Sequence, residues 1–425
     1  METMRAYKFR IYPDRKRQEA IDASISMSQR LYNKLLEKTI DAHKRNPSSK
    51  ISQRTINQFL NEIIKEDKTY LQLYAHVRVD IRNRLLKNYK NFFRRCQQKN
   101  AGAKIKAGFP RFKSKGRFNS ITHIENNGSF NFEKAGKKEM LRISKIGGVQ
   151  IEKHRNIIGN VKTMTIKREG NNYYAIFTAE QTINPPKIED TDPIGIDMGL
   201  NSFIAISDGT KVEKPKFARK KEKKLAHWQS VIAKKDITAK KQKRSKYTKN
   251  RAKAIDHLQE EWREVNNQSN DFAHKLSNKI VNSGYTSFAV ENLNIQSMLQ
   301  NHSLARSIQN ASWNRFAQML SYKAESAGMK VIKVDPRNTS KTCSNCGSIR
   351  DMPLFMREYD CDRCGMQLDR DINASINILK RAREGHSRSN ASGDATSAIQ
   401  RGLQAASVNQ EHTLQPIVAG EAPNL

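Results

Sequence analysis

Four of the five cysteines fall within one short stretch, and their spacing restricts how that stretch can fold. The order is C-x2-C, fourteen residues, then C-x2-C, formed by Cys343, Cys346, Cys361 and Cys364. Each pair places two thiolates on one side of a tight turn, and Gly347 and Gly365 follow where such a turn needs a positive φ. Four thiolates form the tetrahedral site that Zn²⁺ prefers, with an iron–sulfur site or a redox dithiol pair as alternatives. Because all four positions are filled, the zinc is expected to be structural.

The remaining cysteine and the apolar pattern indicate the compartment. Cys96 stands alone in a helical stretch and is interpreted as an ordinary half-buried thiol. In a reducing compartment, a cysteine cluster indicates a metal site rather than disulfides. The chain has no run of about 18 apolar residues, as a membrane span needs, and METMRAYKFRIYPDRKRQ lacks the apolar core of a signal peptide. We therefore expect a cytoplasmic, nucleoid-associated protein without a membrane partner.

The charge of the chain predicts a polyanionic partner. There are 77 lysines and arginines against 42 acidic residues, a formal net charge of +35. Self-repulsion of this size gives a fold no benefit, so nucleic acid is the simplest partner. A ribosome-like structural RNA binder or charge that serves only solubility are the alternatives. Residues 211–253 carry 18 basic against 3 acidic residues, and the pattern LAHWQSVIAKK predicts a helical arm there.

The first half of the chain predicts strands that are interrupted by helices. Tyr7, Phe9 and Ile11 alternate with basic residues, as in a half-buried strand, and VKTMTIKREGNNYYAIFTAEQ reads as a hairpin. Between them, residues 15–98 have helical periodicity, and the basic side chains from Arg78 to Lys90 fit either a solvated helix face or a nucleic-acid surface. GFPRFKSK, basic and aromatic, suits contacts to a nucleic-acid backbone. We expect a β-barrel that contains an inserted helical domain.

The second half alternates strands and helices, which is typical of an α/β domain. The acidic, proline-rich NPPKIEDTDP precedes it and reads as a linker. The C-terminal tail is rich in Ser, Ala, Gly, Asn and Gln, carries 2 basic against 4 acidic residues and is expected to be disordered. The predicted domains are a β-barrel (1–14 and 99–183), a helical domain (15–98), a linker (184–193), an α/β domain (194–342 and 365–383), a zinc ribbon (343–364) and the tail (384–425).

Three acidic residues stand where a buried element begins or ends. Asp197 ends an apolar strand in IGIDMGL, Glu291 ends another in FAVENL, and Asp371 opens the helix DINASINILKRA. Taken singly, they could be a turn acid, a surface acid and a helix N-cap. Together, in a strongly basic α/β protein, they are what two-metal phosphodiester hydrolysis requires, in which carboxylates hold two Mg²⁺ ions about 4 Å apart.

These motifs, in this order, resemble the RuvC-like nuclease core of the TnpB family. That family comprises transposon-encoded RNA-guided endonucleases related to type V CRISPR effectors. The resemblance rests on GIDMGL, VENLN, TSKTCSNCG…CDRCG and DRDINASIN. The opening YKFRIYPDRKRQ and the GFPRFKSK stretch also resemble the first strand and the wedge-like barrel of that family. The resemblance covers residues 5–383.

The resemblance implies a mixed α/β multi-domain fold, with an RNase H/RuvC-like domain, and an RNA-guided DNA endonuclease encoded by an insertion sequence. Its partners would be a guide RNA from the transposon end and target double-stranded DNA, with no protein partner evident. Asp197, Glu291 and Asp371 would be the catalytic Mg²⁺ ligands, Asp369 would have a supporting role, and Asn373 would orient Asp371.

Two alternatives to an RNA-guided endonuclease stay open. One is a guide-independent transposase or RNase H-like nuclease with the same chemistry, and the other is a non-catalytic DNA-binding regulator of transposition. The predicted zinc ribbon directly precedes Asp371. We hypothesise that it braces that acid or gates substrate access to it.

Overall fold

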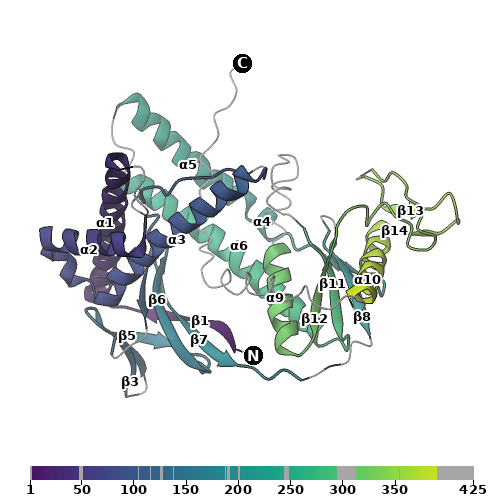
Figure 1. The fold of residues 1–425 in the computed structure, drawn as a ribbon, viewed down its shortest axis with the longest axis horizontal. Coiled ribbons are helices and arrows are strands. Elements are labelled where there is room, and N and C mark those ends of the chain that lie inside the picture. The colour runs from purple at the N-terminus through teal and green to yellow at the C-terminus, as the bar shows by residue number, and fades with distance from the viewer. Residues whose placement is uncertain are drawn as a thin grey trace. The chain divides into compact units, whose positions relative to one another are not determined.

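The computed structural model divides the chain into two compact units, of which the first ends at Thr182 and the second begins at Ile183 (Figure 1). Each unit is described separately below. The structure describes residues 2–389 except 47–50, 104, 115, 125–127, 137, 187, 189–191, 200–201, 244–247, 294–312 and 354.

The first unit contains a curled antiparallel sheet of seven strands. Its strands are β1 (Glu2–Tyr12), β2 (Ser120–Ile124), β3 (Phe130–Ala135), β4 (Lys138–Ile143), β5 (Gly147–Glu152), β6 (Asn160–Glu169) and β7 (Asn172–Thr182). Their spatial order is β2-β6-β7-β1-β5-β4-β3. The predicted hairpin is present as β6 and β7, with Glu169 opposite Asn172. The predicted barrel is a half-barrel instead: within the described residues β2 and β3 are its edges, and β3 has the exposed, charged side chains of an edge strand.

The helices of this unit follow β1 directly. They are α1 (Arg15–Arg45), α2 (Gln53–Glu66), the short 3₁₀ helix η1 (Lys68–Gln72) and α3 (Ala75–Asn100). Asp14 caps α1 by accepting the Arg17 N–H, and Ser52 caps α2 by accepting the Thr55 N–H, so both helices begin where a side chain satisfies a free backbone donor. The apolar face of α1 packs into one core with the sheet and the other helices.

One histidine is buried in this unit without a polar partner. His123 on β2 is 1% exposed, and in the described structure neither ring nitrogen has a hydrogen-bond partner. Its ring stacks on Tyr74 with centroids 5.7 Å apart. Burial, together with the nearby His76, lowers the pKa of His123 to about 4. The native state therefore holds this imidazole neutral.

We predict that the stability of the first unit depends on pH through His123. The unfolded chain takes up a proton near pH 6.5, whereas the folded protein resists it until about pH 4, so stability falls as the pH drops between these values. The full effect is about 3 kcal/mol, from about 1.4 kcal/mol per pKa unit. His123→Phe should reduce this acid sensitivity in denaturant unfolding at a series of pH values, and an unchanged pH profile would contradict the prediction.

The second unit is built on a five-stranded sheet with the order β10-β9-β8-β11-β12. Its strands are β8 (Pro193–Asp197), β9 (Ser202–Ile206), β10 (Lys211–Glu213), β11 (Ser287–Glu291) and β12 (Lys330–Val334). β8, β11 and β12 are parallel to one another, and β9 and β10 are antiparallel to their neighbours. The unit also contains α4 (Phe217–Lys220), α5 (Glu222–Lys241), α6 (Lys249–Val281), α9 (Trp313–Ser326), α10 (Arg370–Ser389) and the hairpin strands β13 (Glu358–Asp360) and β14 (Gln367–Asp369).

Helices cover both faces of this sheet. Phe288 and Val290 of β11 belong to the core formed with α6 and α9, whereas Ala289, which points to the other face, packs against α10. In Figure 1, α9 and α10 accordingly lie on opposite sides of β11 and β12. This alternation explains why β8 and β11 read as nearly continuous apolar runs.

Some boundaries differ from the sequence-based expectations. The arm within 211–253 is helical as predicted, but α6 begins at Lys249 and runs to Val281. The helix α10 extends to Ser389, past the expected domain end at residue 383. The rest of the predicted disordered tail, residues 390–425, lies outside the described residues. In the part of the chain that the structure describes, no helix is long and apolar enough to cross a membrane.

Candidate functional site

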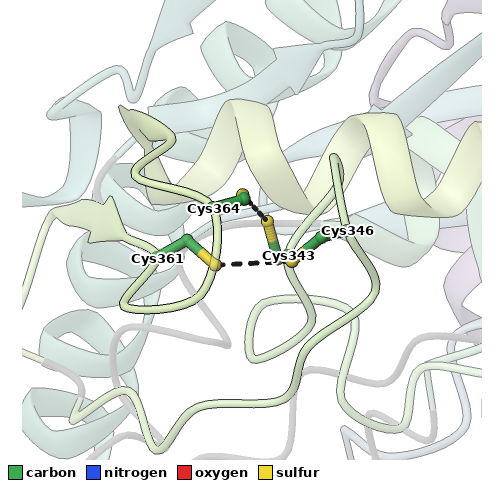
Figure 2. Close-up of side chains that lie close together, drawn as sticks. All are labelled: Cys343, Cys346, Cys361 and Cys364. Atoms are coloured by element: carbon green, nitrogen blue, oxygen red, sulfur yellow. Dashed lines mark hydrogen bonds between the residues drawn. The ribbon is translucent and has the colours of Figure 1, made fainter.

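The four clustered cysteines converge from two turns in the second unit (Figure 2). Cys343 Sγ lies 3.7 Å from Cys364 Sγ, and Cys346 Sγ lies 3.5 Å from Cys361 Sγ. All four sulfur atoms lie within 4.8 Å of one another. A tetrahedral zinc ion with Zn–S bonds of about 2.3 Å needs sulfurs roughly 3.8 Å apart, whereas a disulfide needs about 2.05 Å. The donor set therefore fits zinc.

The turns that carry the cysteines have the predicted backbone. Gly347 has φ 75° and Gly365 has φ 68°, the left-handed region that glycine adopts without strain. Their N–H groups donate to the carbonyls of Cys343 and Cys361. A backbone hydrogen bond from Met366, joined by the Asn345 amide, lowers the pKa of Cys364 to about 6. This environment favours the thiolate that a metal binds.

We predict that the purified protein contains one zinc ion per chain and that Cys361→Ser releases it, because three thiolates hold zinc less tightly than four. Elemental analysis of the folded protein measures the content directly. The matched control is Cys96→Ser, since Cys96 lies in α3, in the other unit, and should leave the zinc content unchanged. Folded wild-type protein without zinc would refute the four-thiolate site.

The strand register brings two of the three candidate acids to one edge of the sheet. β8 and β11 are parallel neighbours with Ile196 opposite Val290, so Asp197 and Glu291 are the next pair along. Both residues end their strands. Since side chains alternate along a strand, both acids share the face of Ala289, which α10 covers.

Two glycines allow α10 to bring the third acid to the same place. A Cβ on Gly195 would lie 2.0 Å from the Ser375 carbonyl oxygen, so α10 lies directly on β8 at that point. A Cβ on Gly199 would lie 3.7 Å from Asp371 Oδ2. Asp371, in the first turn of α10, is therefore beside the loop that follows Asp197. It is 8% exposed.

The three acids interact electrostatically. Burial raises the pKa of Asp197 well above its ordinary value, and the negative charges of Glu291 and Asp371 raise it further. Burial also raises the pKa of Glu291, opposed by a hydrogen bond from Thr339. Two cations partly offset the charge of the acids: Arg370, which donates to Asp371 Oδ1 at 3.4 Å, lowers the pKa of Asp197, and Arg381 lowers the pKa of Glu291. Such a group of carboxylates binds protons or cations strongly.

The acids are less tightly gathered than the cysteines. Among the described residues, only the four cysteines have potential ligand atoms that all lie within 4.8 Å of one another. Two magnesium ions about 4 Å apart, each about 2.1 Å from its ligands, do not require all ligand oxygens to be that close. The oxygen-only donor set is the one that Mg²⁺ prefers.

Asp369 has the supporting role that was expected of it. Its Oδ1 accepts the N–H groups of Asp371 at 2.9 Å and of Ile372 at 3.2 Å, so it is the N-cap of α10. Its Oδ2 forms an ion pair with Lys211. Burial opposes ionisation, but Lys211 and the two amides outweigh it and keep the pKa of Asp369 below its usual value. Because Asp369 is the cap, the N-cap interpretation of Asp371 is wrong.

The expectation for Asn373 is also corrected. Its side chain is fully buried, accepts the Ser344 N–H at 2.8 Å and donates to the Thr342 carbonyl at 2.8 Å, so it holds the chain around Cys343. Sequence reasoning also missed Thr339 and Arg370 as neighbours of the acids. Two asparagines four residues apart in α10, Asn373 and Asn377, indicate that buried polar partners exist, but not which backbone groups these are.

We predict that Gly195→Ala destabilises the second unit by displacing α10, because the new Cβ would overlap a backbone oxygen that cannot move alone. Overpacking of this kind costs about 1–3 kcal/mol or more. Gly148→Ala is the control, since its Cβ would make an ordinary 3.6 Å contact with Met140. Thermal unfolding tests this, and a Gly195→Ala protein that unfolds at the wild-type temperature would contradict it.

Two arginines of the basic helix α3 are held by contacts within the first unit. Arg78 donates to the carbonyls of Tyr70 and Leu73, and Arg84 bonds Asp80, Ser120 and Thr122. Lys87 and Lys90 remain exposed.

The GFPRFKSK stretch presents aromatic rings to solvent. Phe109 is 42% and Phe112 is 55% exposed, and Arg111 between them is exposed. Lys113 is held by Asn33, which bonds both its N–H and its carbonyl. Exposed rings beside cations are typical of surfaces on which bases stack.

Three family models match this chain. Residues 1–47 match a helix-turn-helix domain, residues 175–302 match a probable transposase, and residues 313–378 match the Cas12f1-like TNB domain. The 1–47 match corresponds here to β1 and α1. The TNB match contains β12, the four cysteines and Asp371, and the transposase match contains Asp197 and Glu291.

Individual proteins show the same relationship. A putative RNA-guided DNA endonuclease of Streptomyces pristinaespiralis is 28% identical over 383 residues, covering 89% of each chain. The putative RNA-guided DNA endonuclease InsQ of Escherichia coli K12 is 25% identical over 311 residues, covering 68% of this chain and 70% of InsQ. A Cas12f1 chain, from a structure with guide RNA and target DNA, matches the fold with a TM-score of 0.56 and 14% identity, over 89% of this chain and 99% of that one. Through these matches and its own motifs, the chain belongs to the TnpB family.

Proposed function

We propose that this protein is an RNA-guided DNA endonuclease, encoded by an insertion sequence, that hydrolyses phosphodiesters in target DNA with two Mg²⁺ ions. The observation that carries the proposal is the placement of three acids at one edge of the sheet. There the negative charges of Glu291 and Asp371 raise the pKa of Asp197. The net charge of +35 and the relatives named RNA-guided DNA endonuclease support it.

The three acids would hold the metal ions. Bound Mg²⁺ ions would supply an activated water and neutralise the leaving oxygen. Asp197, Glu291 and Asp371 would together hold the Mg²⁺ ions, since the negative charges of Glu291 and Asp371 act on Asp197. Asp369 and Lys211 fix the start of α10 and hence the position of Asp371. Zn²⁺ at the cysteines would be structural, in a ribbon of residues 343–364.

The rest of the chain would hold the nucleic acids. A guide RNA from the transposon end would provide sequence specificity by base pairing with double-stranded target DNA, so the protein needs mainly contacts to backbones. The half-barrel and helices of residues 1–183 and the basic helices of residues 211–253 supply the cations. We place the nuclease domain at residues 194–342 and 365–383 and the protein in the cytoplasm, at the nucleoid.

The test combines purification with a cleavage assay. Protein expressed from its own locus should co-purify with RNA and cut a matching plasmid in Mg²⁺ but not in EDTA. Asp197→Ala should lower cleavage by at least about 10³-fold, because one carboxylate cannot be replaced in the pair of metal sites. The surface variant Asp351→Ala is the control, since Asp351 is exposed and contacts Lys341.

Two outcomes would overturn the proposal. Cleavage that ignores the RNA would favour a guide-independent nuclease or transposase. Binding of DNA without any cleavage would favour a regulator of transposition.

A further inference from the structure

The segment between β12 and the first cysteine is held by side chains of α10. Residues 335–344, here called the connecting segment, have no helix or strand. Four side chains of α10 form hydrogen bonds with backbone groups of this segment. Arg381 donates to the Asp335 carbonyl, Asn377 to the Thr339 and Thr342 carbonyls, and Lys380 to the Ser344 carbonyl. Asn373 donates to the Thr342 carbonyl and accepts the Ser344 N–H. Asn373, Asn377 and Arg381 are spaced by four residues, so they share one face of α10. The helix that carries Asp371 in its first turn therefore also fixes the chain that leads to Cys343.

Thr339 of this segment contacts a candidate catalytic acid. Its side chain is 4% exposed, and its hydroxyl lies 2.5 Å from Glu291 Oε1 and 3.2 Å from the Pro336 carbonyl. A hydroxyl has one proton to donate, and the shorter contact, to a carboxylate, takes it. One oxygen of Glu291 is thereby fixed by a group that lies on the connecting segment rather than on β11.

A short turn connects Thr339, which contacts Glu291, to Cys343 four residues later. Lys341 and Thr342 donate their N–H groups to the carbonyl of Asn338, which closes a helical turn around Thr339. Cys343 follows at once, and its N–H donates to Ser348. Asn377 donates to both Thr339 O, at 2.9 Å, and Thr342 O, at 2.6 Å, and so joins the two ends of this turn to α10.

We infer that Thr339 is a positioning residue for Glu291, through which the cysteine site and α10 together set the orientation of that carboxylate. The hypothesis from sequence was that the cysteine region braces Asp371. The geometry adds Glu291, which is far away in the chain, on β11. The inference rests on the proposed nuclease function, because it concerns the metal-binding form of Glu291.

The deciding variants change only the hydroxyl of Thr339. Thr339→Val removes it and keeps the shape, whereas Thr339→Ser keeps it. Thr342→Val is the matched control: its hydroxyl donates to the Asn338 carbonyl of the same turn. Mn²⁺ binding to the RNA-loaded protein, followed by electron paramagnetic resonance, is measured together with the Mg²⁺ dependence of cleavage and the zinc content.

The expected result is specific to the hydroxyl. Loss of a hydrogen bond to a charged group should weaken Mn²⁺ binding and raise the half-saturating Mg²⁺ about tenfold in Thr339→Val. Thr339→Ser and Thr342→Val should behave like the wild type, and all variants should retain zinc.

Asn377→Ala tests the link to α10. It should weaken Mn²⁺ binding by itself, and its effect should be smaller in the Thr339→Val background, because both changes act on the same hydrogen bond. If the double variant weakens Mn²⁺ binding by the full product of the two single effects, the two residues act independently. That result would overturn the link between α10 and Thr339.

Failure of the inference and failure of the proposed function are distinguishable. If Asp197→Ala abolishes cleavage but Thr339→Val matches Thr342→Val in both metal measurements, Thr339 has no positioning role. If Asp197→Ala still cuts, the proposed nuclease centre itself is wrong.

Discussion

The candidate centre depends on the direct contact between α10 and β8. Gly195 has no Cβ, and this absence lets the Ser375 carbonyl approach the strand closely enough for the helix to begin beside Asp197. From that contact follow the position of Asp371, the cap by Asp369 and the row of side chains that bind the connecting segment. A single close approach of backbones thus aligns a sheet edge, a helix start and a cysteine site.

The acids explain why these supports are needed. Burial alone makes an ionised Asp197 unfavourable, and two further carboxylates nearby add repulsion. The acids are unfavourable by themselves, and the arrangement is maintained by the surrounding packing and by adjacent cations, among them Arg370 beside Asp371 and Arg381 near Glu291. The sheet, with apolar cores on both faces, supplies that packing. The unfavourable burial and repulsion of the acids are therefore offset by packing in the sheet and its helices, which take no part in the chemistry.

The chemistry of this chain was easier to predict from sequence than its connections. The cysteine spacing, the two positive-φ glycines and the hairpin 161–181 follow from local rules, and the structure confirms each. The roles of Asn373 and Thr339 could not be predicted, because they depend on which backbone groups lie across from α10. The prediction of a closed barrel was wrong, because the sheet is open in the described residues. Alternation of apolar and polar residues along a strand indicates that one face is buried, but it does not indicate whether the first and last strands pair.

The fixed connecting segment has a consequence for how such chains can change in length. Asn373, Asn377, Lys380 and Arg381 of α10 each bond a particular peptide group between Asp335 and Ser344. Inserting or deleting one residue there would therefore shift Thr339 and Cys343 out of register together. The described residues of 349–356, between the two cysteine turns, include exposed side chains such as Ile349 and Phe355, and α10 reaches this tip through Arg370, which donates to the Pro353 carbonyl at 3.5 Å. Natural length variation and engineered insertions should accumulate at this tip rather than in residues 335–344, which should keep a constant length.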